Sequence, residues 1–209
     1  NGDPGGHIAR AMDHFPVPSI AKRIVERYYI PGGKKWDAPY KRVPLFTLTP
    51  PRFLQELTVA ANFVEVWLAK EGHDRPVGIN LMEKIALPNV FSLYGAMLAG
   101  VDYVLMGAGI PIRIPGVLDR LARHKEAALA IPVAGARPGE QFTVRFDPRS
   151  LIGDAALPMK RPRFLAIVAS FILADHLIRK SNGRVDGLII EDHTAGGHNA
   201  PPRGTDRLA

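Results

Sequence analysis

The chain has 209 residues, of which 46% are hydrophobic, and it contains no cysteine. This composition fits one globular domain and excludes a disulfide framework, a thiolate metal site and a cysteine nucleophile. The net charge of +7 comes from basic residues that are interleaved with acidic ones, which favours a solvated surface and no nucleic-acid binding. No apolar run is long enough to span a bilayer, so we expect a cytoplasmic protein without a membrane segment.

The first third of the chain is predicted to be helical. Two short helical pieces occupy residues 1–33, and Ser19 is the expected N-cap of the second piece. The segment 34–44 is polar and rich in proline, which predicts a loop. A longer helix opens at the proline pair of residues 49–51 and ends at Gly72. The expected buried stripe of the second helical piece consists of Ile20, Ile24, Val25 and Tyr28.

From residue 76 onward, strand patterns alternate with helix patterns. The expected strands are 76–81, 101–106, 164–169 and 185–191, and the expected helices are 89–100, 116–124 and 172–180. This alternation predicts an α/β protein with a parallel sheet, either a closed barrel or an open doubly wound sheet. Residues 127–160 interrupt the rhythm and are predicted to be an inserted hairpin and loop, with strand candidates at 127–133 and 141–146.

Polar or glycine-rich groups stand at the end of each of these four expected strands. They are Asn80, the Gly107-Ala-Gly109 turn, Ser170, and the stretch from Glu191 to His198. Because the loops that follow parallel strands converge on one edge of a sheet or barrel, we expect these groups to share a site. Asn80 fits a ligand contact and a local backbone contact equally well, whereas Ser170 is more simply explained as a helix cap.

The last of these stretches carries the residues best suited to chemistry. A carboxylate such as Glu191 is costly at the end of an apolar strand, so it is expected to orient a ligand or the amides of its loop. His193 and His198 lack a third ligand at metal-binding spacing, which argues against a metal site. His198 fits a general base because imidazole titrates near neutral pH, with capping of the following loop as the alternative. The sequence contains no P-loop, no nucleophile elbow and no complete dinucleotide-binding turn.

Two motifs carry a family resemblance. The sequence Glu191-Asp-His-Thr-Ala-Gly-Gly-His198 resembles the Glu-Gly-x-Glu-Ala-Gly-Gly-His motif of nitronate monooxygenases, formerly called 2-nitropropane dioxygenases, and of related FMN-dependent enoyl-acyl-carrier-protein reductases. Gly78-Ile-Asn80 is similar to the Gly-Val-Asn strand of the same family. Asp192 and Thr194 stand where the motif has glycine and glutamate.

The resemblance implies an FMN-binding TIM-type (β/α) barrel. This chain would form a portion of that single domain, because the two opening and two closing strands of the family have no counterpart in it. The absence of an initial methionine and the Pro-Pro-Arg-Gly loop near residue 209 also lead us to expect a piece of a longer protein. The expected cofactor-binding residues are Asn80, Gly107, Ser170, Glu191, Ala195, Gly196 and Gly197, and the expected catalytic residue is His198.

Three functions follow from the resemblance and stay open at this point. The first is oxidation of alkyl nitronates by dioxygen through FMN. The second is NAD(P)H-dependent reduction of an enoyl thioester carried by an acidic acyl carrier protein, which the basic charge would help to dock. The third is a non-catalytic fragment or scaffold, stable as a homo-oligomer or with a partner chain.

Overall fold

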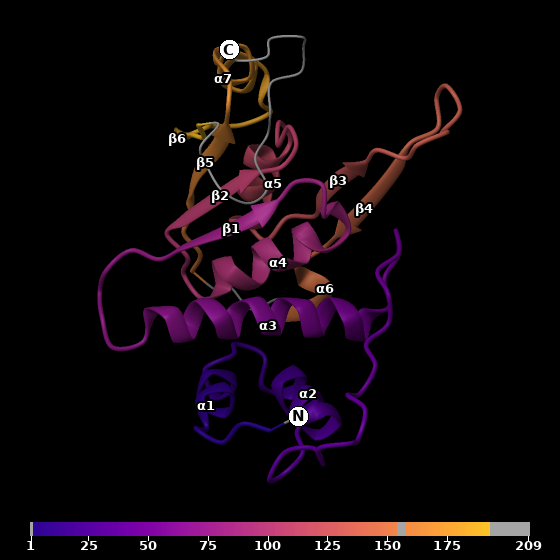
Figure 1. Cartoon of the computed structure of the whole chain (residues 1–209), viewed down its shortest axis with the longest axis vertical. Coiled ribbons are helices and arrows are strands. Elements are labelled where there is room, and N and C mark those ends of the chain that lie inside the picture. Colours follow the sequence, from indigo (N-terminus) through magenta and orange to yellow (C-terminus); the bar gives the residue numbers. More distant parts are fainter. Residues whose placement is uncertain (1, 154–157, 193–209) are drawn as a thin grey trace.

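The computed structural model describes residues 2–153 and 158–192, which form a mixed α/β structure with a parallel sheet (Figure 1). The described helices are α1 (His7–Asp13), α2 (Pro18–Tyr28), α3 (Arg52–Lys70), α4 (Ala86–Leu98), α5 (Ile114–Leu121), α6 (Arg149–Ile152) and α7 (Phe171–Lys180). The described strands are β1 (Gly78–Met82), β2 (Tyr103–Gly107), β3 (Ala127–Ile131), β4 (Phe142–Phe146), β5 (Arg163–Val168) and β6 (Gly187–Ile190). Among the described residues, no helix is long and apolar enough to cross a membrane.

The N-terminal helices form largely as predicted, but the expected cap of α2 was wrong. The helix begins at Pro18, and Ser19 lies inside its first turn, where its side chain makes no capping bond. Proline suits the first helical position because its φ is fixed and it lacks an N–H, so the helix starts two residues earlier than expected, with Val17 at the N-cap. Ile20 and Ile24 are buried as predicted, whereas Val25 is 37% exposed.

Tyr28 carries a buried hydroxyl that has no hydrogen-bond partner among the described residues. Its ring stacks on Phe53 of α3, with ring centroids 5.8 Å apart. An unsatisfied buried hydroxyl costs free energy, so Tyr28→Phe is expected to stabilise the protein by about 1 kcal/mol. Thermal unfolding should show a rise in Tm of about 2–4 °C. Tyr29→Phe, at a side chain that is 45% exposed, is the control and should leave Tm unchanged.

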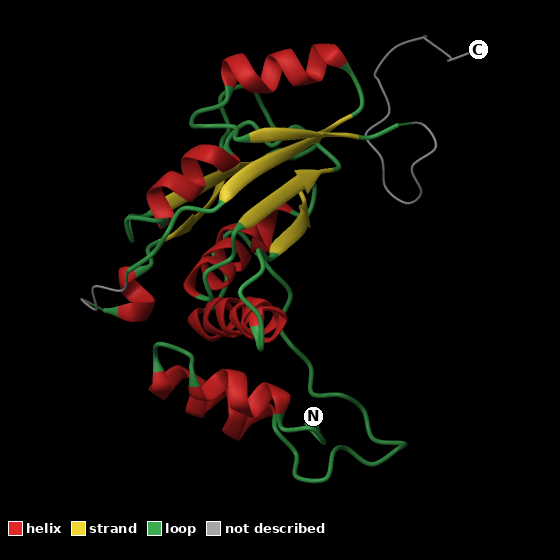
Figure 2. Ribbon diagram, turned by 90° about the vertical axis from the view of Figure 1, so that its left-hand side faces the viewer, coloured by secondary structure: helices red, strands yellow, loops and turns green. Residues whose placement is uncertain are grey.

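The four parallel strands lie in the same order in space as in the chain: β1, β2, β5, β6 (Figure 1). Figure 2 shows the same strands in yellow after a turn of 90°. Because connections between parallel strands are almost always right-handed, this order places the connecting helices on one face of the sheet. Burial agrees for the two central strands, β2 and β5, whose side chains on one face are at most 1% exposed: Val104, Met106, Phe164, Ala166 and Val168. A doubly wound sheet reverses its strand order at a switch point, and the described strands show no such reversal.

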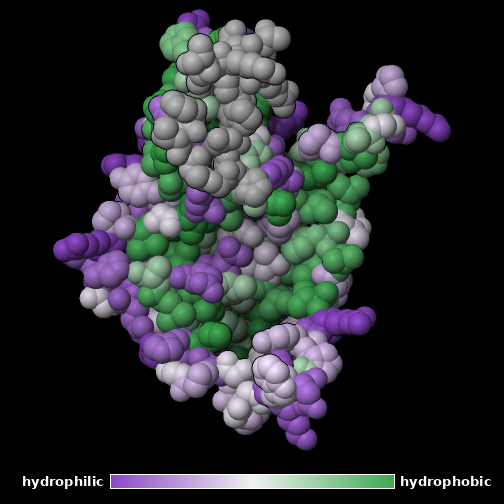
Figure 3. All heavy atoms as spheres, viewed as in Figure 1, coloured by the Kyte–Doolittle hydropathy of each residue, from purple (hydrophilic) through white to green (hydrophobic). Residues whose placement is uncertain are grey.

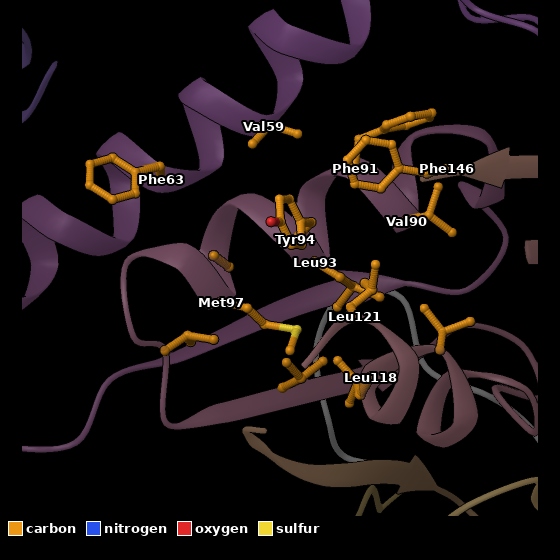
Figure 4. Close-up of a cluster of buried hydrophobic side chains, with 14 of the residues drawn as sticks. Val59, Phe63, Val90, Phe91, Leu93, Tyr94, Met97, Leu118, Leu121 and Phe146 are labelled. Atoms are coloured by element: carbon orange, nitrogen blue, oxygen red, sulfur yellow. The ribbon is translucent and has the colours of Figure 1, made fainter. Parts of the chain in front are cut away.

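The core is centred on α4, which is buried almost all the way round between α3 and the sheet (Figure 4). The run from Asn89 to Met97 is buried without interruption, which is why its sequence is apolar on every side. This helix begins at Ala86, three residues before the expected start at Asn89.

The hairpin predicted between residues 127 and 146 is confirmed. β3 and β4 pair antiparallel, from Ala127 opposite Phe146 to Ile131 opposite Phe142, and form a separate sheet. Phe146 anchors this hairpin to the core, because its ring lies 5.0 Å from that of Phe91 and 5.2 Å from that of Tyr94. The short helix α6 was not predicted and follows directly after the hairpin.

Candidate functional site

The carboxyl ends of the four parallel strands meet along one edge of the sheet. Met82 ends β1 opposite Gly107, which ends β2, and Val168 ends β5 opposite Ile190, which ends β6. β2 and β5 are neighbours that run in the same direction, so all four ends face one side. The predicted convergence of the strand ends is therefore confirmed for the described strands.

Three of the predicted site residues lie at this edge. Gly107 is buried at the end of β2, and a Cβ at that position would lie only 2.9 Å from the Cβ of Ile167. Ser170 caps α7, because its Oγ accepts a hydrogen bond from Leu173 N–H at 3.3 Å, as its simpler interpretation predicted. Glu191 follows β6, and its N–H donates to the carbonyl of Val168 at 2.9 Å.

Asn80 lies farther from the edge than the sequence suggested. It is in the middle of β1, opposite Leu105, and its side chain is exposed. The predicted strand ended at residue 81, one residue too early, which made Asn80 look almost terminal. It can still reach a ligand that lies along the sheet, although the edge itself is formed by the residues that follow it.

The face of the sheet opposite α4 forms an apolar floor, which we call the open face. Its side chains are exposed or only partly buried. They are the apolar Leu105, Leu165, Ile167, Ile189 and Met82, the exposed amide of Asn80, and the hydrogen-bonded pair of Tyr103 and Arg163 at the amino ends of β2 and β5. Gly78 and Gly187 also lie on it, and a Cβ at Gly187 would be 2.9 Å from Leu165. A flat apolar surface with few projecting side chains suits a planar ring.

Sequence reasoning missed Glu83, which follows β1 at the same edge. Its N–H donates to the carbonyl of Gly107 at 2.9 Å, so the backbone holds it beside the end of β2. Burial raises the pKa of the Glu83 carboxyl. A carboxylate that follows an apolar strand was the signal used for Glu191, and it applies equally to Glu83.

A cavity of about 610 Å³ opens beside Glu83, between the loop that follows β2 and the hairpin. Its walls combine apolar side chains such as Ile110 and Phe142 with the charged side chains of Arg113 and Arg145. The stem of the hairpin presents apolar surface and its tip is polar (Figure 3). The cavity can hold a ligand that has both apolar and charged groups.

The remaining predicted residues, Ala195, Gly196, Gly197 and His198, lie outside the described residues, as does His193. Their placement against the strand ends stays a prediction. Within residues 2–153 and 158–192, no cluster of three histidine, aspartate or glutamate side chains could hold a metal ion.

Comparisons of the chain with protein-family models, with curated proteins and with solved structures found no match. The functional argument therefore depends on the sequence motifs and on the geometry of the strand ends.

Proposed function

We propose that the chain forms part of an FMN-dependent (β/α)-barrel oxidoreductase of the nitronate monooxygenase type. The observation that supports this proposal most directly is the order and direction of the strands in the sheet. Four parallel strands in sequential order, with one face covered by helices and the other left open, are what one half of such a barrel requires. Of the motif-bearing residues, Asn80 lies in the first of these strands and Glu191 directly follows the last.

The described residues fit the ring of a flavin. The open face is largely apolar. At its carboxyl end the Ile167 side chain covers Gly107, since a Cβ there would lie 2.9 Å from the Cβ of Ile167, and this aliphatic surface could pack against a planar ring. The amide of Asn80 is exposed on the same face and can both donate and accept hydrogen bonds at the edge of a heterocycle. The residues that would hold the FMN phosphate are not among those predicted from the sequence.

The roles of the chain's own residues follow from this arrangement. FMN, when bound, would supply the electron transfer between an alkyl nitronate and dioxygen. Asn80 and the apolar side chains of the open face would orient the ring and exclude water from it. His198 would donate a hydrogen bond to the substrate or remove a proton from it, because imidazole exchanges protons near neutral pH.

Purified protein is expected to be yellow and to consume dioxygen when an alkyl nitronate is added. His198→Ala should lower the rate by about 100-fold or more, the usual contribution of a positioned acid or base. His176→Ala is the matched control, because His176 is exposed on α7. Flavin absorbance and oxygen uptake provide the measurements. A colourless protein, or oxygen uptake that does not depend on nitronate, would contradict the proposal.

The net charge of +7 favours one alternative, an enoyl reductase that acts on a substrate carried by an acidic carrier protein. Under this alternative, the yellow protein would consume NADPH with an enoyl thioester and would show no nitronate-dependent oxygen uptake. A colourless protein inactive in both assays would instead indicate a non-catalytic scaffold.

A further inference from the structure

The structure leaves one partly buried carboxylate at the strand ends without a protein partner. Among the described residues, none donates a hydrogen bond to the Glu83 side chain or lies within ion-pair distance of it. Its main chain is fixed by the bond from its N–H to the carbonyl of Gly107. Its oxygens are not fully shut off from solvent, so water can supply donors in the free protein, and a ligand that fills the cavity would have to replace them.

The loop that follows β2 is shaped around this side chain. Ala108 has a φ of 52°, and Gly109 has a φ of 154°. A Cβ at Gly109 would lie 2.0 Å from Oε2 of Glu83 and 2.9 Å from its Cβ, so the carboxyl rests directly against the Cα of Gly109. The carboxylate is thus held in one place, between the end of β1 and this loop.

The charged side chains nearest in the cavity do not neutralise Glu83. Arg113 and Arg145 line the same cavity, but Arg145 Nη1 pairs with Glu126 at 3.1 Å instead. Glu140 also lines the cavity and accepts a hydrogen bond from the N–H of Arg137 at 2.9 Å. The Glu83 carboxylate therefore lines the cavity as a hydrogen-bond acceptor, and no donor from the described residues reaches it.

We propose that Glu83 is a substrate-binding residue, which accepts a hydrogen bond from an O–H or N–H group of the substrate. The site would then select substrates that carry a hydroxyl or amino group a few atoms from the reacting carbon. This inference rests on the proposed function, because Glu83 shares the sheet edge with Gly107 and Glu191. A hydrogen bond to a charged acceptor is worth about 10- to 100-fold in selectivity.

Two nitronates that differ only in a donor group test the proposal. Wild-type protein is expected to oxidise the nitronate of 3-nitropropan-1-ol about 10- to 100-fold more efficiently, in kcat/KM, than that of 1-nitrobutane. Glu83→Ala should abolish this preference, and Glu83→Gln should reduce it because the amide oxygen is a weaker acceptor. Gly109→Ala should also reduce it, since the added methyl group displaces the carboxyl. An unchanged preference in Glu83→Ala, or none in wild-type protein, would overturn the inference.

Glu140→Gln is the matched control, because it removes a second carboxylate from the same cavity and should leave the preference intact. If the protein does not oxidise nitronates, the proposed function fails, and calorimetry of 3-nitropropan-1-ol and 1-nitrobutane tests Glu83 separately. Tighter binding of the alcohol by wild-type protein, lost in Glu83→Ala, would support the inference. Equal affinities, or no binding of either compound, would overturn it. Glu83→Gln keeps the side-chain shape and removes a partly buried charge, so it should unfold at or above the wild-type temperature.

Discussion

Asp186→Asn is expected to destabilise the protein by about 3–5 kcal/mol, the usual cost of removing one partner of a buried ion pair. The Asp186 side chain is 5% exposed, and Arg161 Nη1 donates to its Oδ2 at 2.6 Å. The N–H of Phe164 donates to the same oxygen at 2.9 Å. The substitution removes the negative charge and leaves Arg161, whose side chain is 18% exposed, with Asp119 as its one remaining acidic partner among the described residues. Urea unfolding at neutral pH measures the loss.

Asp175→Asn is the control for this prediction. Asp175 pairs with Arg179 on the surface of α7, and their side chains are 40% and 72% exposed. An exposed pair of this kind is worth about 0.5 kcal/mol or less. If the two substitutions destabilised the protein equally, the buried network at Asp186 would not contribute as argued.

Asp186→Asn should also change how the free energy of unfolding depends on pH under acidic conditions. Burial alone would raise the pKa of Asp186, but the hydrogen bonds from Phe164 N–H, Arg161 and Arg184 outweigh it and lower the pKa below 3.8. A group whose pKa is lower in the folded state contributes stability above its unfolded pKa, and this contribution is lost as the pH falls through the folded pKa. The stability difference between wild type and Asp186→Asn should therefore narrow below about pH 4. A constant difference down to pH 2 would contradict this assignment.

Asp102 occupies the equivalent position two βα units earlier, before β2. Its N–H donates to the carbonyl of Val77 at 2.8 Å, and its Oδ2 accepts from the N–H of Val77 at 2.9 Å. Asp186 makes the same two bonds with Phe164. In each unit, an aspartate at the start of a strand secures the start of the neighbouring strand. A valine-aspartate pair marks this position in the sequence in both cases, at 101–102 and at 185–186.

Local patterns were enough to predict most of the elements. α3 formed over nearly its whole expected range, because leucine, valine and phenylalanine recur there at helical spacing. Strand starts were placed two residues too early at residues 76, 101 and 185. At the starts of β2 and β6, the side chain of Asp102 or Asp186 accepts a backbone hydrogen bond in place of a carbonyl, before the regular strand begins.

The order of the strands could not be predicted from the sequence, because each strand could pair with any other of similar apolar character. That order is what separates the open face from the covered face and gives Asn80 its exposed position. Glu83 was missed for a related reason. The expected end of the first strand at residue 81 placed this carboxylate in a loop, whereas it directly follows Met82 at the end of β1.

Gly95→Ala is expected to cost about 3 kcal/mol or more, at or beyond the upper end of the usual penalty for overpacking. Gly95 lies where α4 crosses α3, and a Cβ there would be 2.1 Å from the carbonyl oxygen of Val59 and 2.9 Å from its carbon. Both contacts are with backbone, so no side-chain rotation can relieve them. The helices must move apart, and a gap of 0.5–1 Å already forfeits about a quarter to a half of the dispersion energy.

Gly116→Ala is the matched control, because Gly116 is also helical and gains the same propensity of about 1 kcal/mol. A Cβ at Gly116 would meet Asn182, at 2.5 Å from Nδ2, and that side chain can rotate at the loss of its bond to Gly116 N–H. Chemical denaturation should rank Gly95→Ala far below Gly116→Ala in stability. Equal stabilities would mean that α3 and α4 do not approach each other as closely as their backbones indicate.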